Sequence, residues 1–255
     1  MTSFTKYLRR HPFPVVAHFE RVVAVSFAFP EGTLRSLVPA ALEIDAYEGV
    51  GFLTVAMVWT RKLRPAGFPE VLGQDFLLIG YRVFTRLREG SGRRLRGLNI
   101  LRSETNKRRM VWSGNLFTHY HYRHVNVRLE QAGPETQVET FLGDGTRTLS
   151  LTFGLPEDSV SLPQGSPFRD WHTARLFAGP MPFTFSPEDE THFVVIEGSR
   201  QNWVPRPIPV KDWYVSLFHE TPLRGTKPIL ANSFTVEDVS YRWEKGRIVR
   251  PASVA

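Results

Sequence analysis

Residues 98–130, LNILRSETNKRRMVWSGNLFTHYHYRHVNVRLE, decide how the chain is organised. The pattern predicts a strand over 95–102, a short helix over 105–117, a polar turn and then a further strand. The segment also holds the densest set of side chains able to do chemistry, namely Arg102, Glu104, Asn106, Lys107, Asn115, His119, Tyr120, His121, Tyr122 and His124. We therefore expect a functional site, if there is one, to lie here.

The sequence on either side of this segment predicts mainly strands. β-branched and aromatic residues dominate 15–29 and 51–60, and turn dipeptides divide 124–155 into three short strands. Residues 76–88 alternate, so that Leu78, Gly80, Arg82, Phe84 and Arg86 share one face while Leu77, Ile79, Tyr81, Val83 and Thr85 share the other. This spacing of strands predicts a mainly β (α+β) protein with an antiparallel barrel or sandwich and a few short helices.

Local signals add detail outside the strands. Pro12 and Pro14 predict an extended arm over 1–14, because the residue before a proline avoids the helical region. Thr33 is placed to cap a short helix that Pro39 ends, and Asp170 is placed to cap a second helix over 170–179. The chain shows no internal repeat, and we expect a single domain over 1–255.

Composition excludes several classes of protein. The chain has 255 residues, 42% of them hydrophobic, and no apolar run approaches the roughly 20 residues of a membrane span. It contains no cysteine, which excludes disulfides, thiolate nucleophiles and zinc–thiolate sites. The N-terminal stretch lacks the apolar run of a secretory signal, so by elimination we expect a cytoplasmic protein without a membrane partner.

The charge of the chain is basic but scattered. The formal net charge is +7, and the arginines are spread along the sequence with no basic tail. Such a distribution is more typical of an ordinary solvated surface than of an anion-binding one. No zinc-finger spacing, RNA-binding aromatic signature or helix-turn-helix is evident, so we expect no nucleic-acid partner. No motif calls for a cofactor, and we predict neither a cofactor nor a metal.

Several stretches resemble one known family. PEGTLRSLVPAALEIDAYEGVGFLTVAMVW (30–59), GYRVFTRL (80–87), RSETNKRRMVWSGNLFTHYHY (102–122) and VVIEGSRQNWVPRPIPV (194–210) resemble the YqjF-like proteins of the acetoacetate decarboxylase-like superfamily. The resemblance implies a conical β-barrel with a pocket inside the cone, and a homo-oligomer.

The resemblance fails where the decarboxylase keeps its chemistry. In that enzyme a Schiff-base lysine lies beside a second lysine, whose charge lowers the pKa of the nucleophile. The corresponding place here reads THYHYRH (118–124) and contains no lysine. Lys107 is the nearest amine, and it is either a relocated nucleophile or part of a solvated helix start.

The pattern over 119–122 offers other chemistry. On an extended chain His119 and His121 share one face, and Tyr120 and Tyr122 share the other. The histidines could act as general acid and base, or bind a metal with a third ligand, or simply form local hydrogen bonds. We assign the tyrosines to substrate binding.

Other candidates complete the predicted site. Arg102 and Glu104 form either a structural ion pair or a pocket in which Arg102 binds a substrate carboxylate and Glu104 acts in catalysis. Candidate binding residues from elsewhere are Tyr81, Asn106 and Trp203, although a tyrosine at a strand centre, as Tyr81 is, more often belongs to the core. The predicted function is lyase or hydro-lyase chemistry on a small keto acid, and the alternative is a non-catalytic small-molecule binder or sensor.

Overall fold

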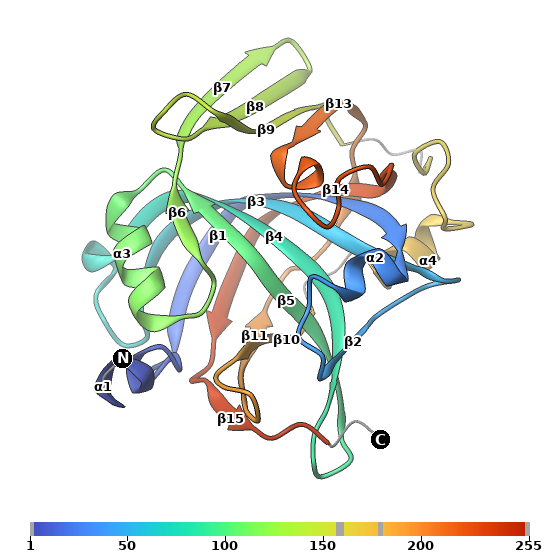
Figure 1. Ribbon diagram of the computed structural model, residues 1–255. Helices are drawn as coiled ribbons and strands as arrows, with labels where there is room; N and C mark the ends of the chain where they lie inside the picture. Colours follow the sequence, from blue (N-terminus) through green and yellow to red (C-terminus); the bar gives the residue numbers. More distant parts are fainter. Residues whose placement is uncertain (1–2, 157–160, 178–180, 253–255) are drawn as a thin grey trace.

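The computed structural model describes residues 3–156, 161–177 and 181–252 and consists mainly of strands (Figure 1). The strands are β1 (Val15–Pro30), β2 (Leu42–Ile44), β3 (Val50–Pro65), β4 (Gln74–Arg88), β5 (Arg94–Thr105), β6 (Tyr122–His124), β7 (Asn126–Ala132), β8 (Glu135–Phe141), β9 (Arg147–Phe153), β10 (Phe183–Pro187), β11 (Phe193–Arg200), β12 (Arg206–Pro207), β13 (Val210–Val215), β14 (Ile229–Trp243) and β15 (Arg247–Val249). The helices are α1 (Ser3–Leu8), α2 (Glu31–Arg35), α3 (Arg108–Phe117) and α4 (Trp171–Arg175), with 3-10 turns η1 (Glu70–Leu72) and η2 (Ser216–His219). Among these helices none is long and apolar enough to cross a bilayer.

The larger sheet closes into a ring. Its strands run in the order β14-β1-β3-β4-β5-β10-β11, and β11 pairs again with β14. All neighbours are antiparallel except β10 and β5, which are parallel. Of the two architectures that the sequence predicted, the ring is therefore a barrel, and the mainly β class is confirmed.

A smaller sheet covers one side of this barrel. Its strands run β13-β9-β8-β7, all antiparallel, and they form the upper layer in Figure 1. A core of buried apolar side chains fills the space between the two sheets, with Tyr81 and Ile79 of β4 against Leu149 and Leu151 of β9. This layer seals the outer face of the barrel strands and leaves their inner face to line the interior.

The alternation predicted for β4 therefore has a clear meaning. Leu78, Gly80 and Arg82 point into the barrel, whereas Tyr81 points to the smaller sheet. A bulge between β4 and β5 follows Tyr81 and shifts the register, so that Arg82 pairs with Ile100. The period of two was confirmed, and it determines which side chains can meet a ligand inside the barrel.

Helix α3 lies across one end of the barrel. Met110, Ser113, Gly114 and Phe117 line the interior, a spacing that places them on one helical face. At Gly114 an added Cβ would lie 2.4 Å from the ring of Tyr122, so only glycine allows that ring to pack against the helix. The predicted helix over 105–117 exists, but it begins at Arg108.

Two local predictions were wrong. The stretch predicted as an extended arm contains α1, because Pro12 and Pro14 restrict only the residues directly before them and the helix ends earlier. Helix α2 follows Pro30 directly and has no side-chain cap, so Thr33 lies inside the helix. The capping role of Asp170 was confirmed, since its Oδ1 accepts from Thr173 N at 2.6 Å. The end of the predicted 170–179 helix, at 178–179, lies outside the described residues.

Candidate functional site

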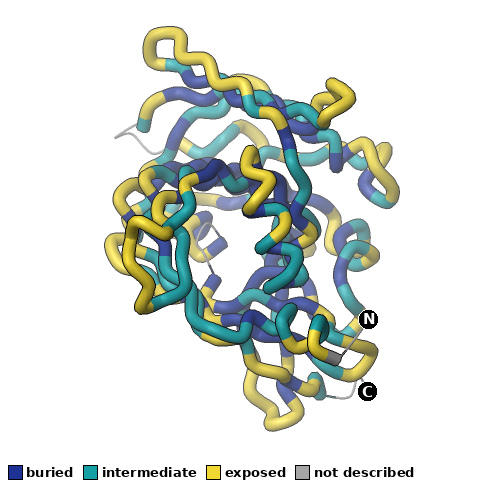
Figure 2. Tube along the Cα trace, turned by 90° about the vertical axis from the view of Figure 1, so that its left-hand side faces the viewer, coloured by how far each residue is buried: buried dark blue, intermediate teal, exposed yellow. Residues whose placement is uncertain are grey.

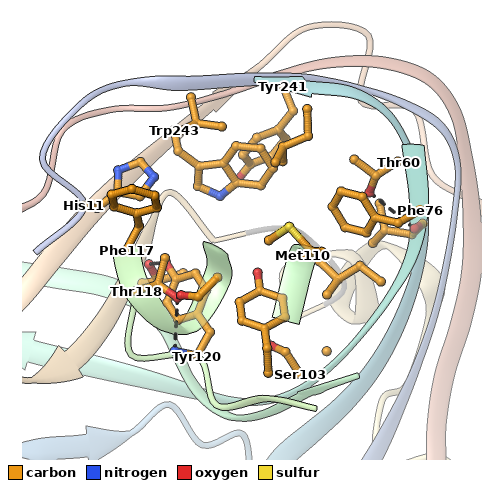
Figure 3. Close-up of a pocket in the computed structure, with 18 of the residues that line it drawn as sticks. His11, Thr60, Phe76, Ser103, Met110, Phe117, Thr118, Tyr120, Tyr241 and Trp243 are labelled. Atoms are coloured by element: carbon orange, nitrogen blue, oxygen red, sulfur yellow. Dashed lines mark hydrogen bonds between the residues drawn. The ribbon is translucent and has the colours of Figure 1, made fainter. Parts of the chain in front are cut away.

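The barrel encloses a cavity of about 330 Å³ that opens beside α3 (Figure 3). Its lining is predominantly apolar and aromatic, as is typical of sites for small molecules. Figure 3 shows Phe76, Met110, Tyr120 and Trp243 around the same space. The aromatic members of the lining are Phe13, Phe19, Phe76, Phe117, Tyr120, Tyr122, Trp203, Tyr241 and Trp243.

Arg82 is the unusual residue of this lining. Its side chain is partly accessible, but the accessible surface faces the cavity and not the bulk solvent. Within the described part of the chain, the lining contains no aspartate, glutamate or lysine, and no ion pair joins Arg82 to any described residue. Burial lowers the pKa of the Arg82 guanidinium, which nevertheless stays charged because arginine is too basic to lose its proton. The cavity therefore holds a positive charge that has no counter-ion among the described residues.

Gly80 makes room for this guanidinium. The two residues share a face of β4, and a Cβ added at Gly80 would lie 2.8 Å from Arg82 Nε. Any larger residue at position 80 would push the guanidinium away from its present place. Gly80 therefore leaves the space that the guanidinium of Arg82 occupies inside the barrel.

Three phenols lie around the guanidinium. Tyr120, Tyr122 and Tyr241 line the cavity, and all three interact with the charge of Arg82. Desolvation raises the pKa of each of these tyrosines, so all three remain neutral near pH 7. The hydroxyl of Tyr120 also forms a 2.6 Å hydrogen bond with Thr184 Oγ1. Neutral phenols can donate hydrogen bonds to an anion that is held by the arginine.

Two further polar groups lie in the lining. His11 Nδ1 donates to the carbonyl oxygen of Glu244 at 3.0 Å, and burial lowers the pKa of His11 to about 4. The ring of His11 is therefore neutral at pH 7. Trp203 lines the cavity as well, and its Nε1 is buried without a hydrogen-bond partner among the described residues.

The predicted catalytic histidines lie outside this lining. His119 Nε2 is 3.6 Å from Glu188 Oε2, and the carboxylate of Glu188 also pairs with Arg10. His121 is exposed and has a positive φ of 52°, so the chain is not extended there. Burial is the main cause that lowers the pKa of both histidines. Lys107 is also exposed, at the start of α3.

Glu104 is buried on the other side of the barrel wall. Its carboxylate accepts hydrogen bonds from Arg123 Nε at 2.9 Å, the Tyr81 hydroxyl at 3.1 Å and Thr148 Oγ1 at 3.0 Å. These groups lie between the barrel and the smaller sheet, where they form a satisfied internal network. The structure thus brings Glu104 and Tyr81 together, but away from the cavity.

The remaining predicted residues divide between the surface and the cavity. Arg102 forms a bidentate ion pair with Glu220, at 3.0 and 2.7 Å. The exposed side chain of Asn106 accepts from the Leu77 amide at 3.0 Å. Tyr120, Tyr122 and Trp203 do line the cavity.

Sequence reasoning missed other residues that line the cavity. These are Arg82, His11, Tyr241 and Trp243. The one signal available in advance was an arginine between apolar residues, Leu78 and Phe84, on one face of a strand, since a charge there needs a partner. Across the described residues, no group of three or more histidine, aspartate or glutamate side chains is arranged to hold a metal ion.

Comparison with solved structures identifies the class of fold. An acetoacetate decarboxylase from Legionella pneumophila superposes with a TM-score of 0.62 and 12% identity, covering 94% of this chain and 88% of that one. The enduracididine biosynthesis enzyme MppR complexed with pyruvate gives 0.60 and 12%, covering 93% and 90%. An acetoacetate decarboxylase-like enzyme from Sphingomonas wittichii RW1 gives 0.56 and 10%, covering 96% and 94%. The chain thus has the acetoacetate decarboxylase-like fold.

The family can also be stated. The model of the DUF2071 family, described as an uncharacterized conserved protein, matches residues 16–236. The chain belongs to this family. No curated protein matches the sequence.

Proposed function

We propose that the cavity binds a small organic anion, with its negative group on Arg82 and its apolar body against the aromatic walls. The observation that carries this proposal is the guanidinium inside the barrel, which has no counter-ion among the described residues. A buried charge is costly unless it is paired, and a carboxylate on the ligand would pair it bidentately. The neutral phenols of Tyr122 and Tyr241 supply further donors at the same place.

The lining also limits the charge and shape of the ligand. Among the described lining residues, Arg82 is unpaired and no other charged group lacks a partner, so the cavity favours a monoanion. Arg64 also lines it, but its guanidinium donates to the carbonyl oxygens of Phe68 and Lys62. The aromatic walls favour an apolar remainder, since each buried methylene contributes about 0.8 kcal/mol. We therefore expect a monocarboxylate with an apolar tail or ring.

A displacement assay tests this proposal with a matched pair of probes. 8-Anilinonaphthalene-1-sulfonate, a fluorescent apolar anion, is bound first and then displaced by octanoate or by octanol. We expect octanoate to displace it at a concentration at least tenfold below that of octanol, and we expect Arg82→Met to abolish the difference. Equal displacement by the two probes in the unmodified protein would rule the anion site out.

Lyase chemistry on a keto acid is the second candidate, for the same cavity. Its support is the fold shared with MppR, whose structure contains pyruvate. Within the described residues no lysine lines the cavity, and an arginine that holds a carboxylate stabilises the state before decarboxylation. Proton transfer would then fall to Tyr120 or Tyr122, or to His119 and His121 if the substrate also reaches the surface.

Borohydride reduction in the presence of pyruvate or acetoacetate tests this second candidate. We expect no covalent adduct on any lysine, Lys107 included, while an active decarboxylase treated in parallel forms one. Turnover of a keto acid that survives alanine at both His119 and His121 would remove the histidines from the mechanism.

The finer assignments drawn from the resemblance belong to the same proposal. We place the chain with the YqjF-like proteins and propose that it is a cytoplasmic homo-oligomer. Light scattering on the purified protein measures the oligomeric state, and fractionation of the source cells tests the location.

A further inference from the structure

The cavity opens at the end of the barrel formed by α1, α3 and the segment between β3 and β4, at the left in Figure 1. Hydrogen bonds tie the residues that follow α1 to the other two segments: Ala66 N donates to Pro14 O at 2.9 Å, and His11 N donates to Phe117 O at 3.1 Å. Leu72 lines the cavity and is also 61% exposed, so the cavity meets solvent here. Figure 2 views the barrel from this side, with exposed loops around the ring.

Large apolar side chains are exposed around this opening. Of the twelve such side chains in the described residues, six lie on these three segments, although the segments are a small part of the chain. Trp112 and Phe4 are each 70% exposed, and Val71 is 88% exposed. The rim patch, as we call this set, consists of Phe4, Tyr7, Phe68, Val71, Leu72 and Trp112. An apolar patch of this kind on a soluble surface marks an interaction site.

Unpaired positive charge accompanies the rim patch. Lys107, Arg108 and Arg109 are exposed, and none forms an ion pair with another described residue. Arg108 lies one helical turn from Trp112, so the two share the outward face of α3. A helix start favours acidic residues, so local helix stability does not explain these three cations.

We propose that the rim patch and these cations dock the protein on a bilayer that contains anionic lipid. Exposed aromatic and aliphatic side chains insert at the interface of a bilayer, and flanking lysine and arginine bind anionic head groups. A second copy of the chain is a poorer occupant, since a symmetric contact through the patch would bring two basic clusters together. Such a contact is peripheral, and it departs from the expectation, drawn from the sequence, of no membrane partner.

Docking at this end would join the bilayer to the cavity. An apolar monoanion partitions into bilayers, and the opening behind Leu72 would receive it directly from the lipid phase. The proposal concerns a surface separate from Arg82, so the two can fail independently.

Vesicle sedimentation with the full chain tests the proposal. Vesicles of phosphatidylcholine alone are compared with vesicles of an equal mixture of phosphatidylcholine and phosphatidylglycerol. We expect binding to the mixed vesicles, with a loss of about tenfold or more in Phe68→Ser/Trp112→Ser. Arg108→Gln/Arg109→Gln should weaken binding about 10- to 30-fold.

Leu176→Ser is the matched control, because Leu176 is 55% exposed at the end of α4, on the far side of the barrel in Figure 1. Its binding should equal that of the unmodified protein. No sedimentation of the unmodified protein, equal binding to both kinds of vesicle, or an equal loss in the control would overturn the proposal. A dimer that the Phe68→Ser/Trp112→Ser change dissolves, without vesicle binding, would overturn it in favour of a second copy.

Octanoate displacement without vesicles separates this proposal from the function proposed above. Phe68→Ser/Trp112→Ser and Arg108→Gln/Arg109→Gln should both keep the octanoate affinity of the unmodified protein. None of these four residues lines the cavity that contains the guanidinium of Arg82. A loss of vesicle binding with octanoate binding intact supports the rim patch. Normal vesicle binding by a protein that does not prefer octanoate to octanol would leave docking in place and refute the anion site.

Discussion

Replacement of Arg82 by methionine should raise stability and lower affinity at the same time. Methionine keeps a long apolar stem but removes the unpaired charge. Replacing a buried ion pair with apolar side chains of similar volume is neutral or stabilises proteins by about 1–4 kcal/mol, and an unpaired buried charge has even less attraction to offset its desolvation. Because Arg82 faces a cavity that water can enter, we take the lower part of this range, about 1–2 kcal/mol. For a chain of this size that corresponds to a rise in Tm of roughly 2–8 °C without ligand.

The loss of affinity follows from the same charge. A hydrogen bond to a charged group contributes about 1.5–3 kcal/mol, and the bidentate pair lies in the upper half of that range. The Kd for octanoate should therefore rise about 40- to 150-fold, whereas the Kd for octanol should hardly change. Differential scanning calorimetry measures the first effect, and the displacement titration measures the second.

Arg86→Met is the matched control for this experiment. Arg86 lies on the same face of β4, but its guanidinium pairs with the fully buried carboxylate of Asp45 at 2.6 Å. Removing one partner of that pair leaves Asp45 with Arg96 alone, so this variant should melt at a lower temperature. The reasoning is refuted if Arg82→Met also lowers Tm in the absence of ligand, or if it binds octanoate as tightly as the unmodified protein.

Three further predictions concern other parts of the structure. The pKa of His11 is about 4 in the folded chain, against about 6.5 when unfolded, so the unfolded chain binds the proton first as pH falls. Protonation of His11 should lower the free energy of unfolding by about 3 kcal/mol between pH 6.5 and pH 4. Urea unfolding of His11→Asn should not show this loss, and asparagine tolerates the positive φ at position 11. Gly80→Ala should weaken octanoate binding about tenfold with less than about 1 kcal/mol change in stability, since the added Cβ meets only the flexible Arg82 side chain; unchanged affinity would contradict the assigned position of the guanidinium. Glu104→Gln should cost about 2–4 kcal/mol of unfolding free energy, because Arg123 loses its buried partner, and the folded fraction should keep its octanoate affinity; a large change in that affinity would place Glu104 in the ligand site.

The strands were predictable because their signal is local. The alternation of β4 separated Arg82 from Tyr81 correctly. Tyr120 and Tyr122 do both line the cavity, but the extended chain on which that prediction relied is absent, since His121 has a positive φ of 52°. Period-two patterns need only neighbouring residues and their polarity. They do not reveal which apolar face meets a cavity and which meets another sheet. Tyr81 was expected near the ligand for that reason, and it lies in the core between the sheets.

The site itself depended on contacts that no local pattern contains. The prediction centred on 98–130, yet Tyr241 and Trp243 come from the last long strand and His11 from the residues before the first. Glu104 looked chemically available, and its carboxylate is used by Arg123 and Thr148. The cluster of polar and titratable side chains in 98–130 therefore predicted one wall of the cavity. The opposite wall consists of residues from distant parts of the chain.

The closure of the barrel has a consequence for how the protein is made. β14 pairs with β1 through Trp243 and Val15, and with β11 through Trp243 and Gly198, so the ring cannot close until residue 243 has been synthesised. A sheet of β1 to β5 without β14 would have an open edge on β1 and an apolar inner face. Pairings of such long sequence separation form slowly, and an open edge invites association with other chains. Substitutions that weaken β14 should therefore strongly reduce the fraction of newly synthesised protein that is soluble. Their effect on the unfolding free energy of the molecules that finish folding should be smaller.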